Sequence, residues 1–319
     1  MPATPLLKRI GRALVREAFR TAALFLLVTL AMFVLLSRAP GDPVALYVNV
    51  QSLSPEEIET VRHELGLDRS LPVRYGVWLR RMVQGDLGTS LRSGRPVALE
   101  LWRTGWRTLL LAGSAMVLTL LFAAVSAYVA AMGRHPLWAS ALTALGYVLS
   151  GLPVFWLGYL AIYLATTRFH VLPVMTGTAG GRGTWSFFWV PVVVLGLGNG
   201  TVSEVTRHLR THLQAVLRED YIRTARAKGA RLWRHLYKDG LVMPLSSLLA
   251  NKIPYVLGGA IVVEQVFNWP GMGRLTWQAA SDRDYPVLLG VTLLSAVIVR
   301  TAHILKEAVQ VAVNPQLAD

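Results

Sequence analysis

The sequence predicts an all-α, polytopic membrane protein with six transmembrane helices. Hydrophobic residues make up 53% of the 319 residues and charged residues only 16%, whereas a soluble domain typically carries about 25% charged residues. The apolar residues gather in long runs, and in a bilayer only a helix or a closed barrel satisfies the backbone hydrogen bonds of such a run. The charges are also unbalanced, with 32 Lys and Arg against 18 Asp and Glu, as expected for basic cytoplasmic loops.

Six apolar runs are the candidate spans. In chain order they are residues 21–36, 108–131, 137–166, 187–202, 241–267 and 286–311. A span needs about 20 largely apolar residues, so the first and the fourth are short. The first can extend backwards through Phe19, and the fourth contains Pro191, which leaves its ends open. A cleaved signal peptide is the alternative for the first run, but residues 37–40 form a poor cleavage site.

The distribution of Lys and Arg near the spans predicts that both termini lie in the cytoplasm. Five basic residues lie within the first 20, and nine more lie from Arg207 to Lys238. Four spans separate these two basic segments, so both lie on the same side of the membrane. The predicted organisation is a cytoplasmic segment 1–20, span 1 at 21–36, a periplasmic segment 37–107, a core transmembrane domain 108–311 with a cytoplasmic loop 203–240, and a cytoplasmic tail 312–319.

The periplasmic segment is expected to be helical. Ser54 and Glu57 have the spacing of a capping box, and Pro55 occupies the first helical position between them, so a helix begins here. Gly66 ends it. A second run at 72–83 carries enough apolar residues for a face that lies on other helices or on the lipid interface. Both helices are interpreted as packing elements without chemistry of their own.

The sequence lacks the motifs of the common enzyme classes. It contains no G-x-x-x-x-G-K-[ST], no H-E-x-x-H and no G-x-S-x-G. The glycine-rich stretch 175–183 lacks the Lys-Ser end of a phosphate loop and is interpreted as a connector. His208 and His212 have the spacing of two metal ligands, but without a third ligand nearby a basic surface helix is the better interpretation. The chain has no cysteine, which excludes thiol chemistry, and we expect no enzyme, no metal site and no cofactor.

The segment from Arg218 to Ala230 has the pattern of a docking element. Its composition is helical up to Gly229, which can adopt the positive φ that ends a helix. A second helical run follows at 231–237, and roughly forty residues separate spans four and five. Two short helices that meet at a glycine form a compact, protruding, basic element, which suits docking by a soluble partner. The alternative is a solvated, positively charged loop.

This segment resembles the cytoplasmic EAA loop of permease subunits in ABC importers. Arg223, Thr224 and Ala225 occupy the E-A-A positions, and Gly229 matches the glycine of the loop. Other stretches resemble the permeases of dipeptide, oligopeptide and nickel importers: A-P-G-D-P at 39–43, L-G-L-D-R at 65–69, L-P-V at 71–73, G-D-L-G-T-S at 85–90, E-Q-V-F-N-W-P-G-M-G at 264–273 and R-D-Y-P at 283–286. The matches follow in order along nearly the whole chain, although residues 239–244 depart from the family's pattern.

The resemblance implies a fold like that of type I ABC importer permeases. The residues that it implies for coupling to an ATPase are Asp220, Tyr221, Arg223, Thr224, Ala225, Arg226, Lys228 and Gly229. The implied partners are a second homologous permease in a heterodimer, two ATP-binding cassette ATPase subunits, an extracytoplasmic substrate-binding protein and membrane lipids, with no nucleic acid. The implied location is the plasma (inner) membrane of a prokaryote.

Polar residues inside the predicted spans are candidates for the translocation pathway or its gate, because ionisable groups in a membrane usually face a cavity or a partner. They are Asn251, Lys252, Glu264, Gln265 and Arg300. The alternative is that Lys252 and Arg300 extend to the cytoplasmic headgroups while Glu264 caps a loop.

We therefore expect a permease subunit that forms half of the translocation pathway for di- or oligopeptides. Import of nickel or a metal chelate by the same architecture is the alternative, since peptide and nickel importers share these motifs. A secondary transporter or channel that works without an ATPase is more distant, because no clear repeat relates the two halves of the chain. A membrane scaffold or sensor would explain the docking element but not the polar residues inside the spans.

Overall fold

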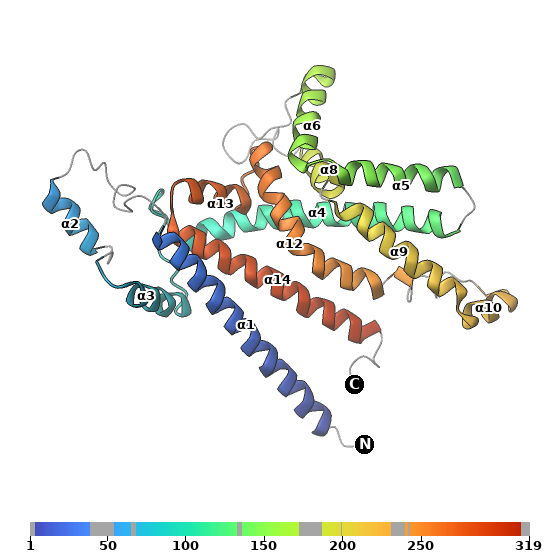
Figure 1. Ribbon diagram of the computed structural model, residues 1–319, viewed down its shortest axis with the longest axis horizontal. Coiled ribbons are helices and arrows are strands. Elements are labelled where there is room, and N and C mark those ends of the chain that lie inside the picture. Colours follow the sequence, from blue (N-terminus) through green and yellow to red (C-terminus); the bar gives the residue numbers. More distant parts are fainter. Residues whose placement is uncertain are drawn as a thin grey trace. The chain divides into compact units, whose positions relative to one another are not determined.

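The computed structural model describes residues 4–38, 54–64, 68–132, 136–171, 187–198, 200–230, 240–241 and 243–313. The regular structure of these residues is helical (Figure 1), with one isolated bridge between Thr89 and Pro96. The all-α prediction is therefore confirmed for this part of the chain. The motif at 39–43, Gly66, the connector 175–183 and the second helical run at 231–237 lie outside the described residues.

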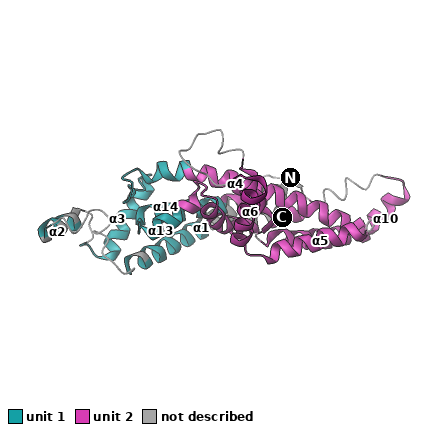
Figure 2. Ribbon diagram, turned by 90° about the horizontal axis from the view of Figure 1, so that it is seen from above, with its two compact units in different colours: residues 1–103, 276–300 teal, residues 104–275, 301–319 magenta. Residues whose placement is uncertain are grey.

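The chain divides into two compact units, shown in different colours in Figure 2. Unit 1 comprises residues 1–103 and 276–300, and unit 2 comprises residues 104–275 and 301–319. The helices are α1 (Thr4–Arg38), α2 (Pro55–Glu64), α3 (Leu71–Val83), α4 (Val97–Met132), α5 (Pro136–Gly151), α6 (Val154–Phe169), α8 (Trp189–Gly198), α9 (Thr201–Arg218), α10 (Asp220–Ala227), α12 (Met243–Val266), α13 (Met272–Ser281) and α14 (Tyr285–Val313).

Every predicted span overlaps a helix, but fewer helices meet the requirements of a span. Among the described residues, α4 and the Tyr285–Glu307 part of α14 are long and apolar enough to cross a membrane. A third span results if the bent pair α5–α6 is counted as one. Phe19–Leu35 of α1 and Trp189–Gly198 are shorter apolar helices, in line with the expectation that the first and fourth runs are short. The count of six spans stays a prediction.

The third predicted run, 137–166, contains two helices. Helices α5 and α6 meet at an angle of 104°, and Pro153 precedes the first residue of α6 with an extended backbone (φ −59°, ψ 135°). Proline has no N–H to continue the hydrogen bonds of α5, so the helix must end before it. The fourth run, 187–202, is likewise divided between α8 and α9, and Gly200 adopts a φ of +70° immediately before α9.

Unit 1 contains the predicted capping box. The backbone N–H of Ser54 donates to the Glu57 carboxylate (2.8 Å), and the N–H of Glu57 donates to the Ser54 hydroxyl (3.3 Å). Both bonds lie at the start of α2, which begins at Pro55 as predicted. Hydrogen bonding to Ser54, through its backbone and then its side chain, lowers the pKa of the Glu57 carboxyl below its usual value.

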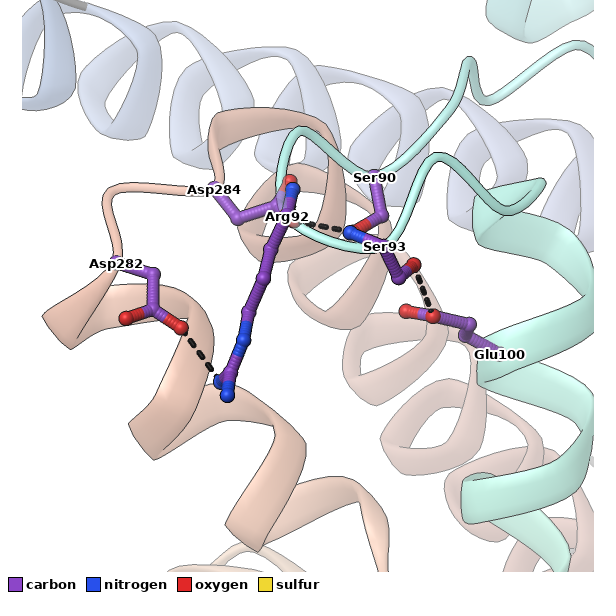
Figure 3. A network of polar contacts seen from close by, with 6 residues as sticks. All are labelled: Ser90, Arg92, Ser93, Glu100, Asp282 and Asp284. Atoms are coloured by element: carbon purple, nitrogen blue, oxygen red, sulfur yellow. Dashed lines mark hydrogen bonds and ion pairs between the residues drawn. The ribbon is translucent and has the colours of Figure 1, made fainter. Parts of the chain in front are cut away.

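A polar network fastens the turn before α4 to the start of α14 (Figure 3). Asp284 is buried and accepts hydrogen bonds from the Ser90 hydroxyl (2.6 Å) and the Arg92 backbone N–H (3.3 Å). Its other oxygen accepts from the backbone N–H of Val287 (3.4 Å), which makes Asp284 the N-cap of α14. Arg92 also pairs with Asp282 through its guanidinium (2.6 Å). The network joins two segments that lie 194 residues apart in the sequence.

The core of unit 2 is formed by α4, α8 and α12, with α6 packed against it. Its buried apolar side chains include Leu111, Ala115, Val192, Leu195, Ala260, Val263, Phe267 and Trp269. A second buried cluster joins the later turns of α4 to α9 through Ala123, Ala127, Val205, Leu209 and Leu213. Helix α9 is thereby held along one face, which positions the segment that follows it.

The close approach of α8 to α4 depends on Gly196. The hydroxyl of Thr119 donates a hydrogen bond to the carbonyl oxygen of Gly196. A Cβ atom at this position would lie only 2.8 Å from the backbone oxygen of Ala115, which cannot move without shifting α4.

We expect Gly196→Ala to destabilise the protein by about 1–3 kcal/mol, because the added methyl group overpacks this contact. The thermal unfolding midpoint of the purified chain in detergent measures the effect. Gly113→Ala is the matched control, since Gly113 lies on α4 and a Cβ atom added there would meet no neighbouring side chain or helix within 4 Å. Equal midpoints for the two variants would contradict the proposed packing.

Candidate functional site

Helix α9 is amphipathic and carries the predicted docking segment at its end. Its buried face includes Val205, Leu209 and Leu213, which contact α4, whereas Arg207 and Arg210 lie on the exposed side. The chain passes from α9 directly into α10 through the extended residue Glu219 (φ −66°, ψ 143°). A short helix at the end of a firmly packed one gives the docking segment a defined position within unit 2.

Gly229 ends α10 as the sequence predicted. Its φ is +67°, its N–H donates to the Arg226 carbonyl (3.0 Å), and the N–H of Ala230 donates to the Ala225 carbonyl (2.9 Å). These two bonds define a Schellman motif with glycine in the left-handed position. The prediction that Gly229 adopts a positive φ is therefore confirmed.

We call α10 and the residues Lys228–Ala230 the knob. Ile222 is fully buried, and of the residues predicted for coupling Ala225 is half-buried while the others are exposed: Asp220, Tyr221, Arg223, Thr224, Arg226, Lys228 and Gly229. Arg223 pairs with Asp220 at 3.5 Å, with both side chains largely in solvent. The knob presents three basic side chains and one aromatic ring around a fixed turn, which suits it to bind a protein surface.

Lys252 lies on α12 and is paired with a residue that the sequence analysis missed. Its side chain is buried, forms an ion pair with Glu204 in the first turn of α9, and lies over the ring of Tyr255 at 4.6 Å. The Lys252 side chain is 10% exposed and that of Glu204 is 39% exposed, so the loss of Glu204 would leave a largely buried ammonium group without its partner. The ammonium group of Lys252 therefore has a partner within this chain. One feature of the sequence could have indicated Glu204 as a partner: it is the only acidic residue in the basic sequence of α9.

Glu264 lies near the end of α12 and is fully buried. One carboxylate oxygen accepts a hydrogen bond from the Thr108 hydroxyl of α4 (2.6 Å), and the other accepts from the backbone N–H of Arg274 in α13 (2.9 Å). The Thr108 oxygen in turn accepts from the N–H of Met272 (2.7 Å). The carboxylate thus caps the N-terminus of α13, where an anion is favoured, and it links three helices.

The glycines that follow α12 make room for this carboxylate. A Cβ atom on Gly271 would collide with the Glu264 carboxylate, and one on Gly273 would lie 2.5 Å from the Cα of Ile261. The turn between the helices contains Asn268 with a φ of +54°. The geometry supports the alternative in which Glu264 caps a loop, and it assigns Thr108 a role that no sequence motif indicated.

The four predicted pathway residues on α12 do not form one cluster. Asn251 and Gln265 are exposed on α12, and Lys252 and Glu264 have separate partners. Twelve residues separate Lys252 from Glu264 along α12, which corresponds to about 18 Å of helix. Arg300 is half-buried and belongs to unit 1.

Two protein families match this chain. Residues 102–319 match the family described as the binding-protein-dependent transport system inner membrane component, and residues 10–95 match the N-terminal part of such membrane components. Curated relatives align over most of both chains. The oligopeptide transport system permease protein AppB of Bacillus subtilis is 32% identical over 95% of this chain and 98% of its own length.

Two further relatives carry a different substrate in their names. The glutathione transport system permease protein GsiC of Pectobacterium atrosepticum is 34% identical over 92% of this chain and 94% of its own length. The protein of the same name in Escherichia coli K12 is 33% identical over 91% and 94%.

We expect the Lys252–Glu204 pair to appear as a coupling in a double-mutant cycle. Lys252→Met and Glu204→Gln each leave one charge without its partner, so the double variant should lose less stability than the two single variants together. The expected interaction energy is about 1 kcal/mol or more. Unfolding of the purified chain in detergent measures it. The exposed pair Arg223–Asp220 is the control and should couple by less than about 0.5 kcal/mol; equal coupling of the two pairs would contradict the role of burial.

We expect Glu264→Gln to destabilise the corner where α4, α12 and α13 meet. If the amide oxygen keeps the Arg274 N–H, the amide NH2 faces the Thr108 hydroxyl, which must then reverse its hydrogen bond and lose its own acceptor. If the amide is turned the other way, its NH2 opposes the Arg274 N–H. Either arrangement disturbs one buried hydrogen bond, at a cost of about 1–3 kcal/mol. The thermal midpoint and the yield of monodisperse protein should both fall. Gln265→Ala changes the exposed neighbour and should have little effect; a Glu264→Gln midpoint equal to that of the parent chain would contradict the capping role.

Proposed function

The chain belongs to the family of binding-protein-dependent transport system inner membrane components, and from this we propose that it forms half of the translocation pathway of an ATP-driven importer for peptides. It is the permease subunit of an ABC importer. The observation that supports the detailed proposal most directly is the knob, an exposed basic helix that ends in a hydrogen-bonded turn at Gly229.

The knob docks an ATPase subunit in this proposal. ATP is hydrolysed in two separate nucleotide-binding subunits, and this chain catalyses no covalent step. When those subunits close, they displace the knob and with it α9, which is packed against α4 and paired with α12 through Glu204 and Lys252. A packed helix moves as a unit, so a displacement at the knob reaches α12, the helix assigned to the pathway.

The other subunits follow from the same assignment. A second, homologous permease completes the pathway as a heterodimer, and an extracytoplasmic binding protein delivers the solute. The names of the relatives, an oligopeptide and a glutathione permease, support a peptide substrate, since glutathione is itself a small peptide. No feature of the described residues favours nickel or another metal.

The pathway assignment includes Asn251, Lys252, Glu264, Gln265 and Arg300. The exposure of Asn251 and Gln265 on α12 supports contact with solute or with the second permease. The internal bonds of Lys252 and Glu264 support a different role, in which these groups hold the helices that line the pathway.

The proposed arrangement in the membrane has six spans. Residues 1–20 and 312–319 lie in the cytoplasm, span 1 covers 21–36, segment 37–107 lies outside, and the core domain 108–311 carries the cytoplasmic loop 203–240. The short apolar stretch of α1 and the length of α4, α12 and α14 support it.

The experiment that tests the function is purification and reconstitution of the whole complex. We expect the tagged chain to co-purify with two ATPase subunits and a homologous permease, and vesicles that contain the complex to take up labelled di- or oligopeptides when ATP and the binding protein are present. Uptake of nickel without uptake of peptides would overturn the substrate class. Uptake by this chain alone would overturn the requirement for an ATPase.

Gly229→Asp should abolish uptake and substrate-stimulated ATP hydrolysis while the permease remains inserted. A side chain at φ +67° strains the turn by about 1 kcal/mol or more, and it adds bulk to the surface that enters the ATPase. Gly94→Asp is the matched control, because Gly94 has a φ of +65° and the same open space at its Cβ position but lies in the turn before α4. Normal uptake by Gly229→Asp would remove the knob from the coupling mechanism.

Single cysteines test the orientation, and the absence of native cysteine keeps the background clean. Ser93→Cys and Ser281→Cys should react with a membrane-impermeant thiol reagent applied to intact cells, whereas Ala230→Cys should react only after lysis. All three positions are exposed, so burial does not explain a difference in labelling. Reaction of Ala230→Cys in intact cells would overturn the six-span arrangement.

A further inference from the structure

Helix α3 carries an unusual combination of exposed side chains. It contains Arg74, Arg80 and Arg81 and no acidic residue. Val73, Val77 and Val83 are 49%, 38% and 77% exposed, and Arg80 and Arg81 are exposed as well. Positions 73, 77, 80 and 81 follow the spacing of one helix face. This outer face therefore presents branched apolar side chains beside two guanidinium groups.

The opposite face of α3 is seated on α1. The hydroxyl groups of Tyr75 and Thr29 form a hydrogen bond (2.9 Å), and the Tyr75 hydroxyl also donates to the Leu26 carbonyl (3.2 Å). The ring of Tyr75 packs edge-on against Phe33 at 5.6 Å and stacks on Trp78 at 5.9 Å. Thr29 is fully buried, although most side chains around it on α1 are exposed.

The contact runs from Leu26, at the middle of the apolar part of α1, to Phe33 near its C-terminal end. That apolar stretch runs from Phe19 to Leu35, and Thr29 precedes its last residue by six positions, or about 9 Å along the helix. An amphipathic helix bound to a membrane surface lies about 5–10 Å deep, at the boundary between headgroups and acyl chains. Tyr and Trp side chains are enriched at the same depth, and α3 places both of them on the side that contacts α1.

We propose that the outer face of α3 lies in the membrane interface and binds anionic phospholipid headgroups. The valines enter the acyl boundary, and the guanidinium groups of Arg80 and Arg81 reach the phosphates, which Arg binds through paired hydrogen bonds. Two positive charges without a negative one on this face favour anionic over zwitterionic lipid, while Arg74 lies over the Phe33 ring of α1 on the packed side. The inference rests on the chain being a membrane protein and not on the solute it transports.

Fluorescence quenching by spin-labelled lipids tests the proposal on the full chain in nanodiscs. A bimane label on Val77→Cys should be quenched by phosphatidylcholine that carries a nitroxide at carbon 5 of the acyl chain. The same label on Glu59→Cys, an exposed position of α2, should be quenched much less. In mixed nanodiscs, spin-labelled phosphatidylglycerol should quench the Val77 label more strongly than spin-labelled phosphatidylcholine.

Removal of single charges tests the lipid preference. Arg80→Gln and Arg81→Gln, each in the Val77→Cys background, should lower the preference for phosphatidylglycerol about fivefold, the factor for one basic residue near an anionic surface. Arg95→Gln removes the same charge from an exposed position in the turn before α4 and should leave the preference unchanged. All these side chains are exposed, so the variants should fold, and size-exclusion chromatography checks that they do.

Two results would overturn the proposal. The first is a Val77 label that lipids do not quench and that an aqueous quencher reaches freely, which would leave this face open to a protein partner. The second is quenching that is equal for phosphatidylglycerol and phosphatidylcholine in the parent chain, which would show that the arginines do not select anionic lipid.

Discussion

A buried carboxylate holds the corner on which unit 2 is built. Glu264 joins the end of α12 to the hydroxyl of Thr108 on α4 and to the first turn of α13. A buried polar group must find partners within the protein, and here each carboxylate oxygen has one. The residues beside the carboxylate must therefore be small. Gly271 and Gly273 have no side chain and leave the space that the carboxylate occupies. The direction in which the chain leaves α12 is thereby determined.

The same constraint governs the other helix ends. Asp284 caps α14 and binds the Ser90 hydroxyl, Ser54 and Glu57 satisfy each other at the start of α2, and Gly229 closes α10 with two backbone bonds. An apolar helix surface can pack in many ways. A backbone N–H or carbonyl at a helix end needs a specific hydrogen-bond partner, and a shift of the helix end would break that bond. The polar ends therefore define where long apolar helices start, stop and turn.

The sequence predicted the features that depend on neighbouring residues. The capping box at Ser54, the end of α10 at Gly229 and the positions of the apolar helices all follow from local patterns. In the sequence, only Pro153 indicated the division between α5 and α6. The angle between these two helices was not predictable, because it depends on what each helix packs against. The partners of Lys252 and Glu264 are Glu204 and Thr108, 48 and 156 residues away, and no local pattern reports such a distance.

The knob is less stable locally than the helix that carries it. Ile222 is the one buried side chain of the eight-residue helix α10, whereas α9 buries six. The free energy of local opening scales with buried apolar contacts, so α10 opens far more often than the helix that carries it. A partner that binds only the closed turn contributes its binding energy to that equilibrium. Hydrogen exchange of the α10 amides is then slowed by docking, and the protection of this single turn reports the occupancy of the whole assembly.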